Sequence, residues 1–289
     1  MARPAYIQQV GPEVLPRVSA VEGRGRAFSM TLKAGLPLVD AVRDGFAREG
    51  FASGVLNFGE MALGPFAYVM PALSKDGKNA AFYSDTFRPD GITRTEEGAL
   101  TFGVRDGAPF FHCHALWREA DGKRTGGHIL PEETIMAEDA VVSAFGITGA
   151  GFEGNLDPEI NFKVFGPVKA STSATKTEAR AFAMRLHPNR CFHTLLEEFA
   201  REKGLTRATV HGGVGSTIGA LLEDGHEVEN FATEVYITKG TIDPDASGNP
   251  VATLDVGLVD YTGGIAQGRL KRGANPVLMT FELIVSENP

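Results

Sequence analysis

The chain repeats its own sequence, and this repeat constrains the fold more than any other feature. Residues 26–32, which read RAFSMTL, return 154 positions later as RAFAMRL at residues 180–186. The next block, residues 38–50, returns in the same way as residues 192–204. Because the matching blocks keep their order, we expect the two halves to fold as two copies of one unit.

Each half is predicted to open with a strand, a helix and a second strand. Leu195 and Phe199 lie one helical turn apart, and Gly204 stands where a helix would end. The pattern predicts helices over residues 37–50 and 191–204. We therefore expect an α+β fold that consists of two tandem antiparallel-sheet domains, each with one packed helix.

The repeat and the composition of the intervening stretches divide the chain into four segments. Residues 1–20 contain several prolines and are predicted to be an N-terminal arm. Residues 21–148 and 178–289 are the two predicted domains. The glycine-, serine- and threonine-rich residues 149–177 are predicted to link them.

Three of the seven histidines fall within 17 positions, and they suggest a metal site. Residues 111–118 alternate in polarity, so His112 and His114 would point to one face of a strand. If a hairpin turns about Asp121, His114 faces His128, and such cross-strand pairs have Cβ atoms about 4.5–5.5 Å apart. Three neutral imidazoles with an open fourth position describe a catalytic zinc site, although another divalent transition metal would also fit.

This interpretation depends on the register of the hairpin. A two-residue turn at Asp121 and Gly122 would shift the pairing by one residue and turn His128 to the opposite face. An odd loop, or a bulge at Gly126 and Gly127, would keep it on the same face. The alternative is three unrelated histidines beside a solvated hairpin.

The second half repeats the hairpin without its imidazoles. Asp255 takes the place of His114 and Arg269 takes the place of His128, with the same separation of 14 residues. Asp and Arg directly across a hairpin would form an ion pair. We therefore predict one metal site per chain, in the N-terminal half.

Three charged residues are candidates for catalysis beside the histidines. Glu60 follows a predicted strand end and could move protons as a general acid or base. Arg118 shares the alternating face with the histidines and could bind a substrate carboxylate. Glu138 lies on the next predicted strand, where it could act in catalysis or form a structural salt bridge. For Glu60 and Arg118 the alternative is an ordinary solvated side chain.

Composition bounds the environment and the partners of the protein. The net charge is −8, whereas a protein with duplex DNA as its main partner is normally basic. The chain contains no run of 18 apolar residues, so the sequence predicts no membrane-spanning helix. The two cysteines, Cys113 and Cys191, do not suggest a disulfide framework, so a cytoplasmic location is expected.

The motifs around the histidines resemble the PPC domain (plants and prokaryotes conserved, DUF296). The matching motifs are HCH at residues 112–114, GGH at residues 126–128 and TIMAE at residues 134–138. The resemblance covers most of residues 24–147, and residues 178–287 look like a second, diverged copy.

The resemblance implies a fold similar to acetolactate decarboxylase and to a zinc-dependent ester hydrolase family, which hold zinc with a similar histidine motif. It also implies a homo-oligomer, because PPC domains commonly form trimers. Bacterial members are often described as DNA-binding because plant relatives carry AT-hooks. Here residues 24–26 read RGR, but Ala27 follows where an AT-hook has proline.

Together these features predict a zinc-dependent lyase or hydrolase that acts on a small carboxylated or carbonyl compound. The reaction would be decarboxylation or the hydrolysis of an ester or a lactone. The alternative is a DNA-associated or ligand-sensing PPC-domain binding protein with a structural metal. The sequence does not separate these reactions or identify the substrate, because a fold does not fix a function.

Overall fold

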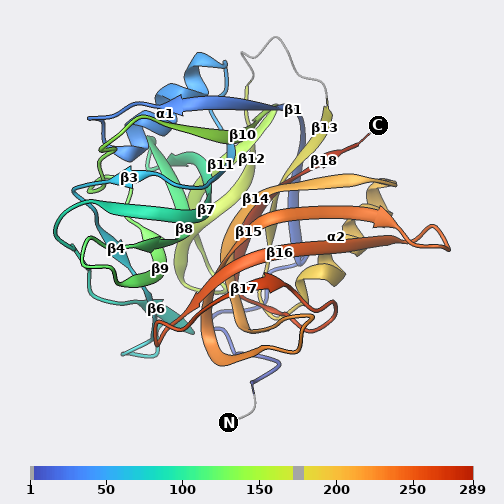
Figure 1. The fold of residues 1–289 in the computed structure, drawn as a ribbon. Helices are drawn as coiled ribbons and strands as arrows, with labels where there is room; N and C mark the ends of the chain where they lie inside the picture. The colour runs from blue at the N-terminus through green and yellow to red at the C-terminus, as the bar shows by residue number, and fades with distance from the viewer. Residues whose placement is uncertain (1–2, 172–178, 289) are drawn as a thin grey trace.

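One 16-stranded sheet organises the molecule, as a computed structural model shows for residues 3–171 and 179–288 (Figure 1). All but one of its strand pairings are antiparallel. Two helices, α1 (Leu38–Arg48) and α2 (Phe192–Lys203), accompany it, so the fold is mostly β rather than an even mixture of helix and sheet. Neither of these helices is long and apolar enough to cross a membrane.

The strands fall into three groups along the chain. The N-terminal half contains β1 (Val18–Leu32), β2 (Gly54–Phe58), β3 (Ala62–Leu63), β4 (Tyr68–Val69), β5 (Pro71–Leu73), β6 (Ala81–Tyr83), β7 (Thr93–Arg105), β8 (Ala108–Arg118), β9 (Arg124–Ile129) and β10 (Ala140–Thr148). The middle contains β11 (Ala150–Asp157) and β12 (Phe162–Lys169). The C-terminal half contains β13 (Ala179–Leu186), β14 (Ala208–Leu221), β15 (Glu227–Pro244), β16 (Pro250–Asp260), β17 (Ile265–Arg269) and β18 (Val277–Glu287).

The two halves arrange their strands in the same order. From the middle of the sheet outwards, the N-terminal half runs β1-β10-β2-β7-β8-β9 and the C-terminal half runs β13-β18-β14-β15-β16-β17. Strands β1 and β13 pair antiparallel, so the halves share one sheet instead of forming two separate ones. Figure 1 shows the blue and green half beside the orange and red half.

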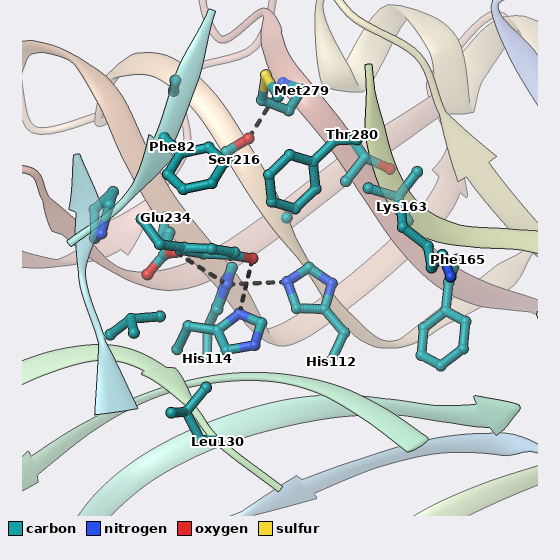
Figure 2. A pocket seen from close by; sticks show the side chains of 18 of the residues that line it. Phe82, His112, His114, Leu130, Lys163, Phe165, Ser216, Glu234, Met279 and Thr280 are labelled. Carbon is teal, nitrogen blue, oxygen red and sulfur yellow. Dashed lines mark hydrogen bonds and ion pairs between the residues drawn. The ribbon is translucent and has the colours of Figure 1, made fainter. Parts of the chain in front are cut away.

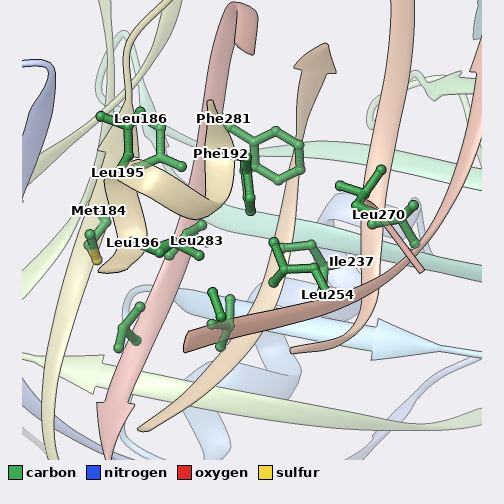
Figure 3. Packing of buried hydrophobic residues seen from close by; sticks show 14 of the residues in the cluster. Met184, Leu186, Phe192, Leu195, Leu196, Ile237, Leu254, Leu270, Phe281 and Leu283 are labelled. Atoms are coloured by element: carbon green, nitrogen blue, oxygen red, sulfur yellow. The ribbon is translucent and has the colours of Figure 1, made fainter. Parts of the chain in front are cut away.

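The helices form where the apolar spacing predicts them. Helix α2 buries Phe192, Leu195, Leu196 and Phe199, which lie on one face of a 3.6-residue period, against strands of the C-terminal half (Figure 3). It ends at Gly204, which has a φ of 67° in the left-handed region that glycine adopts without strain. Helix α1 packs in the same manner over the N-terminal half.

The predicted linker, residues 149–177, contains the antiparallel pair β11 and β12. Its apolar side chains Phe152 and Phe165 are buried in a cluster that joins the two halves, which explains why this stretch is ordered as a hairpin. Strand β11 also forms the one parallel pairing, with β7. The predicted domain boundary at residues 177 and 178 lies outside the described residues.

Buried ion pairs tie the N-terminal arm and the hairpin to the start of the C-terminal half. Arg17 contacts Glu159 at 2.7 Å, and Arg185 contacts Asp157 at 2.6 Å. His187 follows β13 beside these pairs and is only 2% exposed. Burial, together with the nearby positive charges of Arg185 and Arg17, lowers the pKa of His187 to about 4.

Stability is expected to fall as the pH falls from 6.5 to about 4, partly because of His187. In this range the unfolded chain binds a proton at residue 187 and the folded chain does not, so protonation favours unfolding by up to about 3 kcal/mol. The free energy of unfolding of wild type should therefore decrease relative to that of His187→Gln as the solution is acidified, despite the nearby Asp157 and Glu159. Parallel curves in urea titrations across this pH range would contradict the assignment.

Candidate metal centre

The histidines lie on the β8–β9 hairpin, and its register is the predicted one. His114 is paired directly with His128, and Arg118 is paired with Arg124 at the end of the ladder. The loop between them has five residues, an odd number, so all paired positions keep their faces. Gly127 has a φ of 154°, and a Cβ there would lie 2.5 Å from the carbonyl oxygen of Val69.

The alternation of β8 places the imidazoles opposite the core. Phe111, Cys113 and Trp117 are fully buried in the hydrophobic core of the N-terminal half. His112 and His114 therefore point away from that core, towards the C-terminal half. Cys113 is a buried core residue, as the pattern predicts, and burial raises the pKa of its thiol.

Three imidazoles come together on this face. Their ring centroids are 4.6 Å apart for His112 and His114, 5.0 Å for His112 and His128, and 5.5 Å for His114 and His128. Each ring offers one nitrogen, and these nitrogens lie within 4.8 Å of one another. The distances suit three ligands of one ion.

Hydrogen bonds orient two of the rings so that their Nε2 atoms converge. The Nδ1–H of His112 donates to Glu282 Oε2 at 2.7 Å, and the Nδ1–H of His114 donates to the carbonyl oxygen of Val235 at 3.1 Å. Both Nε2 atoms then carry lone pairs, and they lie only 3.1 Å apart (Figure 2). Two lone pairs at this distance repel each other unless a proton or a metal ion lies between them. The donor set therefore fits a divalent metal, with outer hydrogen bonds typical of histidine ligands.

Burial keeps two of these rings in the neutral form that metals require. Loss of solvent lowers the pKa of His114 and of His128 well below the usual value, and repulsion from the neighbouring histidines adds to this effect. The hydroxyl of Tyr83 lies 3.2 Å from Nδ1 of His128 and holds the third ring from strand β6. Burial also raises the pKa of Tyr83, so its hydroxyl stays protonated.

Glu234 of strand β15 brings a carboxyl group to the cluster from the C-terminal half. Its Oε1 lies 3.6 Å from Nε2 of His114, and its Oε2 has no hydrogen-bond partner among the described residues. The side chain is almost completely buried, which raises the pKa of its carboxyl group well above the usual value. Neither Glu234 nor Glu282 is predicted from the motifs of the sequence, although a charged residue within an apolar strand is a signal that could have found both.

The histidines open onto a cavity of about 310 Å³ between the two halves. Strands β6, β8, β9, β12, β14, β15 and β18 all contribute to its wall, and Figure 2 shows His112, His114 and Glu234 close together among the lining side chains. Most of the wall is apolar, for example Phe82, Phe162 and Leu278. A mainly apolar cleft with a few convergent polar groups is the usual form of a small-molecule site.

The three predicted catalytic residues lie outside this cavity, which corrects their predicted place beside the histidines. Arg94 binds the exposed carboxylates of Glu60 and Glu138 at 3.1 and 2.8 Å. Arg118 shares the face of the histidines but lies at the far end of the hairpin, where it is more than half exposed and contacts Glu96. Alternation fixes the face of a strand but not the distance along it, and this explains the error.

The equivalent hairpin of the C-terminal half contains the predicted ion pair. Asp255 and Arg269 face each other across β16 and β17, with Oδ1 and Nε 2.8 Å apart. Gly268, which precedes Arg269, has a φ of 155°, almost the same as Gly127 before His128. The two hairpins thus share their backbone conformation, but the second has an ion pair where the first has imidazoles.

Solved structures similar to this chain match about half of it. A plant- and prokaryote-conserved (PPC) protein from Pyrococcus horikoshii has 17% identity and a TM-score of 0.39, over 54% of this chain and 99% of that one. A metal-containing protein from Archaeoglobus fulgidus has 18% identity and a TM-score of 0.38, over 50% and 94%. A protein from Ralstonia eutropha, described as a candidate DNA-binding protein, has 16% identity and a TM-score of 0.35, over 48% and 89%.

Sequence comparison gives a more specific result. No curated protein matches the chain. The family model of the Plants and Prokaryotes Conserved (PCC) domain matches residues 173–289, the half that the resemblance predicted to be the diverged copy. The comparison thus identifies similarity to the Plants and Prokaryotes Conserved domain in residues 173–289.

Proposed function

We propose that the protein is a metal-dependent enzyme that acts on a small carbonyl compound in the cavity between its halves. The observation that carries this proposal is the convergence of the Nε2 atoms of His112 and His114, 3.1 Å apart, in the wall of a mainly apolar cavity. His112, His114 and His128 would hold the ion. A set of three nitrogen ligands favours zinc.

Each group around the cluster has a role in this proposal. A bound zinc ion would act as a Lewis acid on a carbonyl group of the substrate. Glu282 and the carbonyl of Val235 orient His112 and His114. Glu234 holds a proton at its unpartnered Oε2 and passes it to or from the substrate. The aromatic wall excludes water from the reacting groups. Decarboxylation and the hydrolysis of an ester or a lactone both fit this arrangement.

The test is a screen of the zinc-loaded protein against esters, lactones and β-keto acids. Any activity found should disappear in a His114→Ala/His128→Ala variant and persist in Asp255→Ala/Arg269→Ala, which changes the equivalent pair of the other hairpin. Glu234→Gln should lower turnover by about 100-fold, the size of a typical proton-transfer contribution. Activity that survives the loss of both histidines would contradict the proposal.

A metal without catalysis is the second candidate, and Glu234 is the observation that favours it. Its Oε1, 3.6 Å from Nε2 of His114, could supply a fourth ligand and close the site. In that case Glu234→Gln should lose metal, whereas a proton-transfer role leaves the metal content unchanged and lowers only turnover. Two statements stay predictions: that DNA is not the main partner of the protein, and that the protein forms a homo-oligomer.

A further inference from the structure

Arg105, at the end of strand β7, is a cation of the cavity wall that forms no ion pair with any described residue. The wall contains one other cation, Lys163, and its Nζ is bound to both oxygens of Asp106 at 2.7 and 2.9 Å. Among the described residues, no carboxylate or carbonyl oxygen accepts a hydrogen bond from the guanidinium of Arg105. Its five N–H donors are therefore available to a ligand.

The side chain of Arg105 is held in place by its neighbours. Its aliphatic part crosses Gly154, where a Cβ would lie only 2.9 Å from Cγ of the arginine. Its guanidinium carbon lies 3.4 Å from the centre of the Phe110 ring, a stacked cation–π contact. A guanidinium that is already positioned loses less conformational entropy when it binds an anion.

Arg105 and the histidines belong to the same cavity. The positive charge of Arg105 contributes to the lowered pKa of His128 and acts against the raised pKa of Tyr83, which places it within electrostatic reach of both. Much of the remaining wall is apolar, with Phe82, Phe162 and Leu278 among its residues. The same space thus offers both a guanidinium and the imidazole cluster.

We propose that Arg105 binds the carboxylate of a small monocarboxylate whose apolar or aromatic body fills the cavity. A planar guanidinium pairs with a carboxylate through two parallel hydrogen bonds. A single charge is favoured over a phosphate dianion because only one wall cation is unpaired among the described residues and the carboxyl group of Glu132 also lines the space. The claim that this ligand is the substrate rests on the proposed function. The claim that it binds at Arg105 does not.

The test is calorimetric titration with 3-phenylpropanoate and with its uncharged amide, 3-phenylpropanamide. The carboxylate should bind the wild-type protein, and Arg105→Gln should weaken this binding by about tenfold or more, as expected for a charge-assisted pair. The amide should bind both proteins equally weakly. Arg43→Gln, which removes an exposed arginine of helix α1, is the matched control and should bind like wild type.

Two further variants separate a direct contact from a structural or long-range effect. Gly154→Ala keeps the charge of Arg105 but pushes its aliphatic part away from its position, so it should also weaken carboxylate binding. Arg105→Lys keeps the charge without the planar pair of donors and should recover only part of the affinity. Arg105→Gln should stay folded and unfold only slightly below wild type, because the side chain contributes a cation–π contact with Phe110 but no hydrogen bond to the described fold.

Three results would overturn the inference. The first is equal affinity of wild type and Arg105→Gln for the carboxylate. The second is Arg105-dependent binding of inorganic phosphate that is tighter than that of the carboxylate. The third is carboxylate binding that chelator treatment removes but Arg105→Gln does not, because the carboxylate would then bind the metal. Arg105-dependent binding in a protein that turns over no carbonyl compound would sustain this inference and contradict the proposed function. The two can therefore fail separately.

Discussion

Replacing His114 and His128 together with alanine is expected to reduce the bound metal from about one ion per chain to none, because one imidazole cannot replace three ligands. Both side chains are buried in the wall of the cavity, where His112 is the one other described residue that offers an imidazole. The measurement is elemental analysis of protein purified without chelators and then loaded with zinc.

The matched control changes the other hairpin. Asp255→Ala/Arg269→Ala removes the paired side chains at the equivalent positions of β16 and β17, and it should bind as much metal as wild type. Equal metal content in the two double variants would show that the histidines do not form the site. Circular dichroism should show that both variants keep their sheet.

Replacing Arg185 with methionine is expected to destabilise the protein by about 3–5 kcal/mol, because it leaves a buried charge without its partner. Arg185 and Asp157 are 7% and 5% exposed and lie 2.6 Å apart. Arg185 also donates from Nε to Thr280, whose hydroxyl donates to Glu282, the residue that orients His112. The measurement is the free energy of unfolding from urea titration.

Strand β13 offers a control for this prediction. Arg180 on the same strand contacts Glu22 at the surface, where solvent screens the pair, so Arg180→Met should cost less than about 1 kcal/mol. Replacing Asp157 and Arg185 together with leucine and methionine should recover much of the loss, because no unpaired charge stays buried. A loss no larger for Arg185→Met than for Arg180→Met would contradict the argument.

Local patterns in the sequence predicted the elements and one hairpin in detail. Apolar spacing and the following glycine located both helices, and Gly204 ends α2 as predicted. Alternation and an odd loop set the register that pairs His114 with His128. The internal repeat identified Asp255 and Arg269 as the pair that replaces the imidazoles. These features depend on residues that are close in the chain, so short-range periodicity reports them.

The tertiary structure alone decided what surrounds the imidazoles. Glu282 and Glu234 reach them from strands 170 and 120 positions away from His112 and His114, because the β1–β13 pair joins the halves into one sheet that curls around the cavity. By the same geometry, Arg105 lies in the wall of the cavity, and Arg118 lies outside it. Periodicity determines which face of a strand a side chain occupies. Only the packing of one half against the other determines which distant side chain meets it there.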